Sequence, residues 1–176
     1  VGNLTPSEPH QFIFICRQEH AHRYALTDVL QLIAPGSRIT VMHDSTAGAL
    51  CSVLLAMEHF TDDCELLIAN SDQYLEEDIN RFLATARLDG TDGCIMTFPS
   101  THPKWSYVKL VDGEVLTVAE KRPISSHATT GLYYFRRSAD FLAAAEKMIL
   151  KNASREGEFF VSPVYNELIL AGKRIT

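Results

Sequence analysis

Short, dense apolar runs alternate with longer stretches of helical periodicity through the first half of the chain. This alternation restricts the fold more than any other feature of the sequence. The predicted strands and helices are, in chain order, 12–16, 19–33, 38–42, 46–60, 65–69 and 74–88. The strand runs are continuously apolar, which is typical of parallel strands that helices cover on both faces.

The second half of the chain predicts a different arrangement, in which strands follow each other directly. These strands span 94–98, 107–111, 115–119 and 131–135, and helices follow at 138–151 and 161–170. Asp112-Gly113, between two of the strands, is a hairpin turn signal. We therefore expect a single domain over residues 1–176, an α/β fold built on one mixed sheet.

The composition argues against several classes of protein. The 176 residues include 16 Lys and Arg against 22 Asp and Glu, and the net charge of −6 argues against a general nucleic-acid binder. No apolar run reaches the roughly 20 residues of a membrane-spanning helix. A polyanionic ligand would need cations placed locally, so a divalent metal ion is an expected partner. The four scattered cysteines fit no zinc spacing and indicate small buried residues in a reducing compartment.

Polar residues follow the predicted strand 65–69, at the edge where open α/β sheets bind ligands. The segment Asn70-Ser71-Asp72-Gln73 places a carboxylate between amide side chains, and Asp72 suits the role of an Mg²⁺ ligand. The same residue types also form turns and helix caps. The sequence leaves these two interpretations about equally open.

Four further segments combine residue types that suit contact with a ligand. In Glu120-Lys121, at the end of a predicted strand, the lysine would hold a phosphate and the glutamate would accept sugar hydroxyls, whereas a solvated charge run is the simpler interpretation. The other three segments also have structural alternatives. Thr129-Thr130-Gly131 could mark a bulge, and Gly157-Glu158 could place a favourable charge in the first turn of a helix. Thr46-Ala47-Gly48 could form a close helix–sheet contact.

The order and spacing of these segments resemble those of the sugar-1-phosphate nucleotidyltransferases, and glucose-1-phosphate thymidylyltransferases are the most similar group. The resemblance runs from about residue 12 to the C-terminus, and its most specific part is the pair of Glu-Lys and Thr-Gly-Leu-Tyr elements at 120–121 and 130–133. It implies a Rossmann-like three-layer α/β/α domain with a mixed, mostly parallel sheet. It also implies an Mg²⁺-dependent reaction of a nucleoside triphosphate with a sugar 1-phosphate, which gives a nucleotide sugar and pyrophosphate.

The resemblance assigns roles to individual residues. Asp72 corresponds to the metal-binding aspartate and Lys121 to the cation on the sugar phosphate, and we expect these two side chains to converge on one pocket. The residues implied on the nucleotide side are His43, Thr46 and Gly48, and those implied on the sugar side are Gln73, Glu120, Thr130, Gly131 and Glu158. Trp105-Ser106 stand where the family usually has Tyr-Gly.

Two elements of the family pattern are not found in the sequence. The family has a first strand with a Gly-rich loop that carries Arg and then Lys and grips the triphosphate, and nothing similar precedes residue 12. The second metal-binding aspartate of the family would lie beyond residue 176. We therefore expect a domain that is incomplete at both ends: either the natural protein is longer, or another segment or chain fills the place of the first strand. Little or no turnover is predicted for the 176 residues alone.

Two other functions remain open on the sequence. One is a nucleotide-sugar-dependent glycosyltransferase of related fold, although Asn70-Ser71-Asp72 lacks the first Asp of the usual Asp-x-Asp. The other is a non-catalytic module that binds a nucleotide sugar. The resemblance also implies a cytoplasmic protein of polysaccharide biosynthesis and is compatible with a homo-oligomer, but it specifies neither the base nor the sugar.

Overall fold

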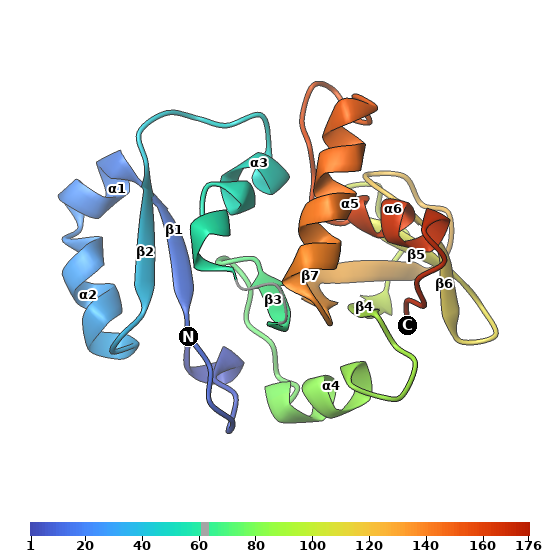
Figure 1. The fold of residues 1–176 in the computed structure, drawn as a ribbon, viewed down its shortest axis with the longest axis horizontal. Helices are drawn as coiled ribbons and strands as arrows, with labels where there is room; N and C mark the ends of the chain where they lie inside the picture. Colours follow the sequence, from blue (N-terminus) through green and yellow to red (C-terminus); the bar gives the residue numbers. More distant parts are fainter. Residues whose placement is uncertain (61–63) are drawn as a thin grey trace.

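The computed structural model describes residues 1–60 and 64–176 (Figure 1). The strands in these residues are β1 (Ile13–Arg17), β2 (Arg38–Met42), β3 (Leu66–Ala69), β4 (Gly93–Pro99), β5 (Tyr107–Val111), β6 (Glu114–Ala119) and β7 (His127–Phe135). The α-helices are α1 (Gln18–Arg23), α2 (Leu26–Ile33), α3 (Ala49–Leu54), α4 (Ile79–Ala86), α5 (Ser138–Leu150) and α6 (Val164–Leu170). Two short 3-10 helices, η1 (Gly2–Leu4) and η2 (Met57–His59), complete the set. The expected α/β fold is confirmed.

The long strand β7 organises the larger sheet. Its residue Phe135 pairs with Leu66 of β3 and with Gly93 of β4, so these two strands lie along opposite edges of β7. The N-terminal end of β7 pairs with β5, and β5 pairs with β6 through the predicted hairpin. Asp112 and Gly113 both have positive φ angles there, 51° and 83°, as a tight hairpin turn requires.

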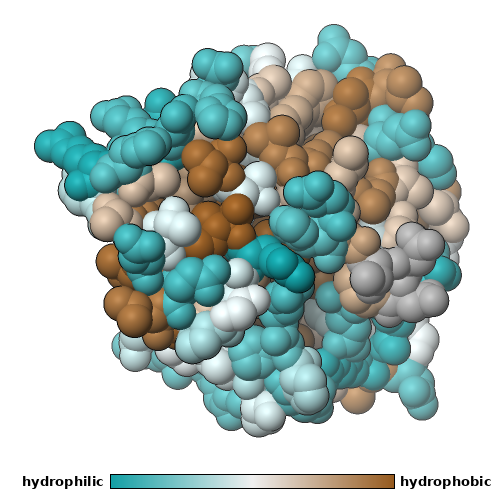
Figure 2. All heavy atoms as spheres, turned by 60° about the vertical axis from the view of Figure 1, so that its left-hand side comes forward, coloured by the Kyte–Doolittle hydropathy of each residue, from teal (hydrophilic) through white to brown (hydrophobic). Residues whose placement is uncertain are grey.

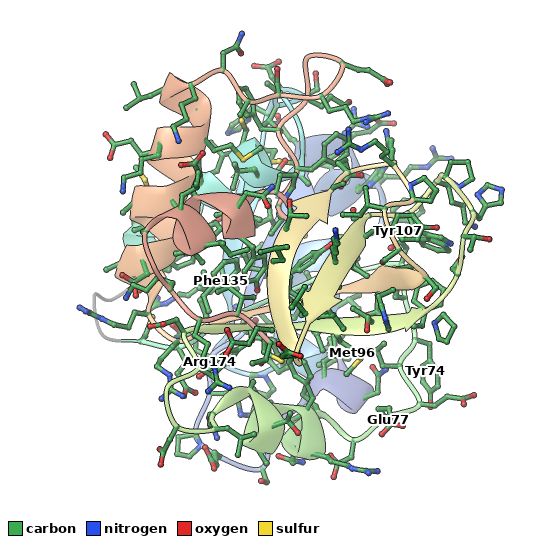
Figure 3. All side chains as sticks on the ribbon, turned by 90° about the vertical axis from the view of Figure 1, so that its right-hand side faces the viewer. Tyr74, Glu77, Met96, Tyr107, Phe135 and Arg174 are labelled. Carbon is green, nitrogen blue, oxygen red and sulfur yellow. The ribbon has the colours of Figure 1, made fainter. Side chains whose placement is uncertain are left out.

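Side chains of β7 alternate between two cores. Tyr133 and Phe135 belong to the cluster that includes α5 and α6, whereas Leu132 and Tyr134 belong to the cluster that includes α4. The Phe135 ring, labelled in Figure 3, stacks on Tyr165 of α6 with 4.5 Å between ring centres. Helices therefore cover both faces of this sheet, as expected for three layers.

Among the described strands, only β1 and β2 pair in parallel, and they form a sheet of their own. An isolated parallel bridge also joins Gly93 of β4 to Ile175 near the C-terminus. Every ladder between two strands of the larger sheet is antiparallel in the described residues. The expected parallel set does not extend to β3, because among the described residues β3 pairs with β7 and makes no ladder with β1 or β2. No residue of β1 or β2 is buried, whereas seven of the nine residues of β7 are.

The helices are shorter than the periodicity predicted. The helix expected at 19–33 is divided at Ala25, which has a left-handed φ of 45°, and Tyr24 is 58% exposed instead of facing the core. The helix expected at 74–88 begins only after Asp78, whose carboxylate accepts a hydrogen bond from the Asn80 N–H and so caps α4. Tyr74 precedes this cap and lies at the edge of the molecule (Figure 3).

The surface around β1 and β2 carries polar and apolar side chains in separate patches (Figure 2). The exposed large apolar residues of α2 are Val29, Leu32 and Ile33. None of the helices in the described residues is long and apolar enough to cross a membrane.

Candidate functional site

The segment that follows β3 packs against a kink in β7. Gly131 has a φ of +83° at the point where β7 changes partners from β5 to β3, opposite a register shift between Ile95 and Thr97 of β4. The Asn70 N–H donates to the Gly131 carbonyl over 3.2 Å. A Cβ atom at Gly131 would lie 2.3 Å from Asn70 Nδ2 and 3.0 Å from Gln73 Oε1. The predicted site residues Gln73 and Gly131 are thus close together, and an irregularity of the strand is confirmed at this glycine.

Asp72 lies in the turn after β3, and its side chain is exposed. It forms no ion pair with another described residue, so its carboxylate remains available to a ligand. Within residues 1–60 and 64–176, no group of three or more His, Cys, Asp or Glu side chains could hold a metal ion. A single exposed carboxylate fits Mg²⁺ when phosphate oxygens and water complete the coordination, and it does not fit a closed protein cage.

Gly48, which precedes α3, packs against the backbone of the loop that leads into α6. The Phe159 N–H donates to the Ala47 carbonyl over 2.8 Å, and the Leu50 N–H donates to the Phe159 carbonyl over 2.9 Å. Gly48 has a φ of +105°, and a Cβ atom there would lie 2.5 Å from the Phe159 oxygen. Thr46 Oγ1 donates to the Gly48 carbonyl over 3.0 Å and so fixes the approach to α3. A close contact of this glycine was predicted, but its partner is a loop and not the sheet.

Two serine hydroxyls hold the carboxylate of Glu120, directly after β6. Ser162 Oγ donates to Glu120 Oε2 over 2.9 Å, and Ser106 Oγ donates to the same oxygen. Tyr133 lies near this group and hydrogen-bonds with Thr129 over 3.0 Å. Burial raises the pKa of Tyr133, the hydrogen bond with Thr129 lowers it, and the charge on Glu120 raises it, with a net increase. Tyr133 is therefore a neutral hydroxyl beside an oriented carboxylate.

The chain turns sharply at Lys121, which has a left-handed φ of 48°. Its Nζ lies 4.8 Å from the centre of the Phe160 ring, a cation–π contact. Neighbouring residues of a strand point to opposite faces unless a bend intervenes. Here the bend lets Glu120 and Lys121 contact residues of one segment, Ser162 and Phe160 respectively. In the described part of the chain, Lys121 forms no ion pair.

A shallow, open pocket lies beside Glu120. It is lined by Val118, Ala119, Glu120, Arg122, Ser154 and Arg155. Two arginines and a glutamate among the lining residues suit a ligand that carries both anionic groups and hydroxyl donors.

The other predicted site residues have local partners. His43 Nδ1 lies 2.8 Å from Gln18 Oε1, and Thr130 Oγ1 donates to the Met96 carbonyl over 3.2 Å. Glu158 has an exposed side chain, and its backbone pairs with a neighbouring turn. No described contact joins these three residues to each other.

The described contacts do not join Asp72 to Lys121, and the convergence of these side chains on one pocket stays a prediction. No sequence pattern assigned a role to Phe160 and Ser162, although both lie within four residues of the predicted site residue Glu158. For Ser106, the resemblance indicates only that it stands where the family usually has Gly. Ser106 and Glu120 are 14 residues apart and lie at the open end of the β5–β6 hairpin. The Asp112-Gly113 turn signal could therefore have predicted that they face each other.

The α/β fold and the combination of a carboxylate after β3, a Glu-Lys pair after β6 and a close-packed glycine before α3 agree with the resemblance to the nucleotidyltransferase class. The sequence profile of the family described as "Nucleotidyl transferase" matches residues 1–173, and the chain belongs to this family. No curated protein sequence matches the chain.

Solved structures give the same result for the fold. The nucleoside-diphosphate-sugar pyrophosphorylase from Vibrio cholerae RC9 is 28% identical, with a TM-score of 0.74, over 97% of this chain and 71% of that one. A protein from Bacillus anthracis described as a glucose-1-phosphate thymidylyltransferase, in complex with sucrose, is 18% identical, with a TM-score of 0.68, over 93% of this chain and 65% of its own. The inositol-1-phosphate CTP transferase from T. maritima is 13% identical, with a TM-score of 0.66, over 94% of this chain and 64% of that one. The chain thus spans about two thirds of the length of these proteins.

Proposed function

We propose that the chain takes part in the transfer of a nucleotidyl group from a nucleoside triphosphate to a sugar 1-phosphate. The observation that carries this proposal is the position of residues 159–162. Their backbone contacts the Gly48 loop, and their side chains contact Glu120 and Lys121. They therefore join the segment that the family resemblance assigns to the nucleotide with the pair that it assigns to the sugar phosphate.

The chemistry of the site suits this reaction. A phosphate oxygen of the sugar phosphate attacks the α-phosphorus, a new P–O bond forms, and the bond to the leaving pyrophosphate breaks. Lys121 offsets phosphate charge and Glu120 accepts a hydrogen bond from a sugar hydroxyl, so the protein acts by positioning and charge neutralisation.

A metal ion forms part of the proposal because the substrates repel each other. Two like charges 4 Å apart repel by about 4 kcal/mol at an effective dielectric constant of 20, and a triphosphate beside a sugar phosphate has several such pairs. One lysine does not offset them. Mg²⁺ bound by Asp72 would supply the remaining neutralisation.

The same proposal extends to the setting of the reaction. It includes a cytoplasmic location and a role in polysaccharide biosynthesis, both of which follow from the resemblance. It also includes assembly into a homo-oligomer.

Calorimetric titration of the chain with a panel of nucleotide sugars and with glucose 1-phosphate tests the proposal. We expect Lys121→Ala to weaken binding by about tenfold, as the loss of a charged contact does. Lys109→Ala removes an exposed lysine from β5 and is the matched control. Absence of binding to every probe, or equal effects of the two substitutions, would overturn the proposal. Pyrophosphate release from any nucleoside triphosphate with glucose 1-phosphate would separate an enzyme from a binding module.

A further inference from the structure

Glu120 and Lys121 carry opposite charges on adjacent residues, yet their side chains do not pair with each other in the described structure. Both residues are half-buried, and without other contacts long charged side chains sample many rotamers. A ligand that needs both groups would have to order them at the expense of its binding energy. The contacts around the pair remove much of that disorder before any ligand arrives.

Each of the two side chains has its own restraint. Glu120 Oε2 accepts hydrogen bonds from Ser162, over 2.9 Å, and from Ser106. The Lys121 ammonium lies over the Phe160 ring at 4.8 Å. Ser162 is 2% exposed, so its hydroxyl is held in place by the surrounding core.

The two restraints come from one short segment with fixed ends. On one side its backbone is hydrogen-bonded to the Gly48 loop at Phe159, and on the other it continues through Pro163 into α6. Val161, between the two contact residues, is buried in the larger core. A segment anchored in this way transmits a defined position to both charged side chains.

We propose that Phe160 and Ser162 are positioning residues that hold Lys121 and Glu120 apart and ready for a sugar phosphate. This inference rests on the function proposed above and adds two residues to it. With Oε2 occupied, Glu120 presents Oε1 to a hydroxyl donor, because in the described residues this oxygen accepts no hydrogen bond. With a ring in place of a carboxylate as its partner, the Lys121 ammonium keeps its charge available for a phosphate.

The first arm of the test needs no ligand. An ammonium over an aromatic ring places the neighbouring Lys121 methylene protons in the shielding region of the ring, so their NMR resonances are shifted upfield. We expect Phe160→Leu to remove this shift and Phe160→Tyr to retain it. Ser162→Ala is expected to move the carboxyl-carbon resonance of Glu120. Unshifted Lys121 resonances in the wild-type chain, or resonances that Phe160→Leu leaves unchanged, would overturn the positioning role.

The second arm measures binding of glucose 1-phosphate and of inorganic phosphate to the same variants. Phe160→Leu should weaken both by about two- to fivefold, the range of an exposed cation–π contact, and Phe160→Tyr should restore them. Ser162→Ala should weaken glucose 1-phosphate and leave inorganic phosphate unchanged, because Glu120 serves the sugar. Tyr24→Leu, which removes the contact of Arg23 with a remote ring at 5.4 Å, is the control and should change neither.

The two arms separate the two proposals. The chain could show upfield-shifted Lys121 resonances and yet bind neither probe nor any nucleotide sugar. This result would overturn the proposed function, and it would also overturn the inference that these residues are positioned for a ligand. Probe binding that is indifferent to Phe160→Leu would overturn the positioning role and leave the proposed function standing.

Discussion

Gly131 lies so close to Asn70 that residue 131 has no room for a side chain. A Cβ atom would approach Asn70 Nδ2 to 2.3 Å, and the same Asn70 donates its backbone N–H to the Gly131 carbonyl. The central strand and the segment that carries Asp72 therefore hold each other in position. The position of the candidate metal ligand depends on this contact.

Gly131→Ala should lower the free energy of unfolding by more than the cost of its positive φ angle, because the new Cβ atom would also clash with Asn70. Gly113 has the same φ of +83°, and a Cβ atom there would have no other atom within 4 Å, so Gly113→Ala reports the backbone cost, about 1–2 kcal/mol. We expect Gly131→Ala to lower the free energy of unfolding by roughly 1–3 kcal/mol more, the range for overpacking. Urea unfolding of both variants measures the difference, and equal losses would contradict the steric argument.

Glu65 should contribute stability that acid removes. Burial raises the pKa of Glu65, but hydrogen bonds from Arg87 and Tyr134 lower it by more, so the pKa lies below its ordinary value of 4.5. A carboxyl group with a lowered pKa stabilises the fold above the unfolded-state pKa, and the contribution disappears as the pH falls through the folded-state value. The stability difference between wild type and Glu65→Gln should therefore shrink as the pH falls below about 4.5.

Denaturant unfolding at several pH values measures the effect of Glu65→Gln. The control is Glu77→Gln, since Glu77 forms an exposed i,i+4 ion pair with Arg81 at 3.8 Å. Pairs of this kind contribute less than about 1 kcal/mol. A pH profile of Glu65→Gln parallel to that of the wild type would show that folding does not lower the pKa of Glu65.

Asp72→Asn should abolish the effect of Mg²⁺ on nucleoside triphosphate binding. The substitution keeps the shape of the side chain and removes the charge that a hard cation requires. Calorimetric titration with and without Mg²⁺ measures the change, and Asp28→Asn, at an exposed position of α2, is the control. The same Mg²⁺ enhancement in Asp72→Asn as in the wild type would exclude this residue as the metal ligand.

Amide hydrogen exchange should be much faster in β1 and β2 than in β7. The first two strands contain no buried residue and pair only with each other among the described residues, whereas β7 is mostly buried and has a partner on both edges. Exchange protection follows local burial and hydrogen bonding. Similar protection in β1 and β7, measured by NMR or mass spectrometry, would show that β1 is covered by something other than the described contacts.

The sequence predicted elements well where a single local rule decides the structure. The strand at 107–111 has the predicted bounds, and Asp112-Gly113 forms the predicted turn because few residues tolerate two successive positive φ angles. The predicted helices are too long where a cap residue or a left-handed residue sets a helix boundary. Asp78 caps the start of α4, and Ala25 separates α1 from α2. Periodicity continues through such points, so it does not reveal them.

Local sequence patterns marked individual segments of the candidate site, but they did not predict which side chains contact each other. Residue type and position marked Gln73, Gly131 and Glu120, but the partners of Glu120 are 14 and 42 residues away in the sequence. The contact with Ser106 follows from the β5–β6 hairpin, whereas the contact with Ser162 joins two distant segments that no local pattern pairs. Continuous apolar runs carry no register, so pairing of β3 with β7 could not be derived from them.

The central place of β7 has a consequence for how the chain is made. Its partners β3, β4 and β5 all precede it, and none of them completes its ladder until residues 127–135 are available. During synthesis, the segment from 66 to 111 must therefore leave the ribosome with unpaired edges and wait for a strand made later. Strands with unpaired edges can aggregate or bind chaperones before their partner is made. The rate at which residues 112–135 are translated would therefore influence the yield of folded protein.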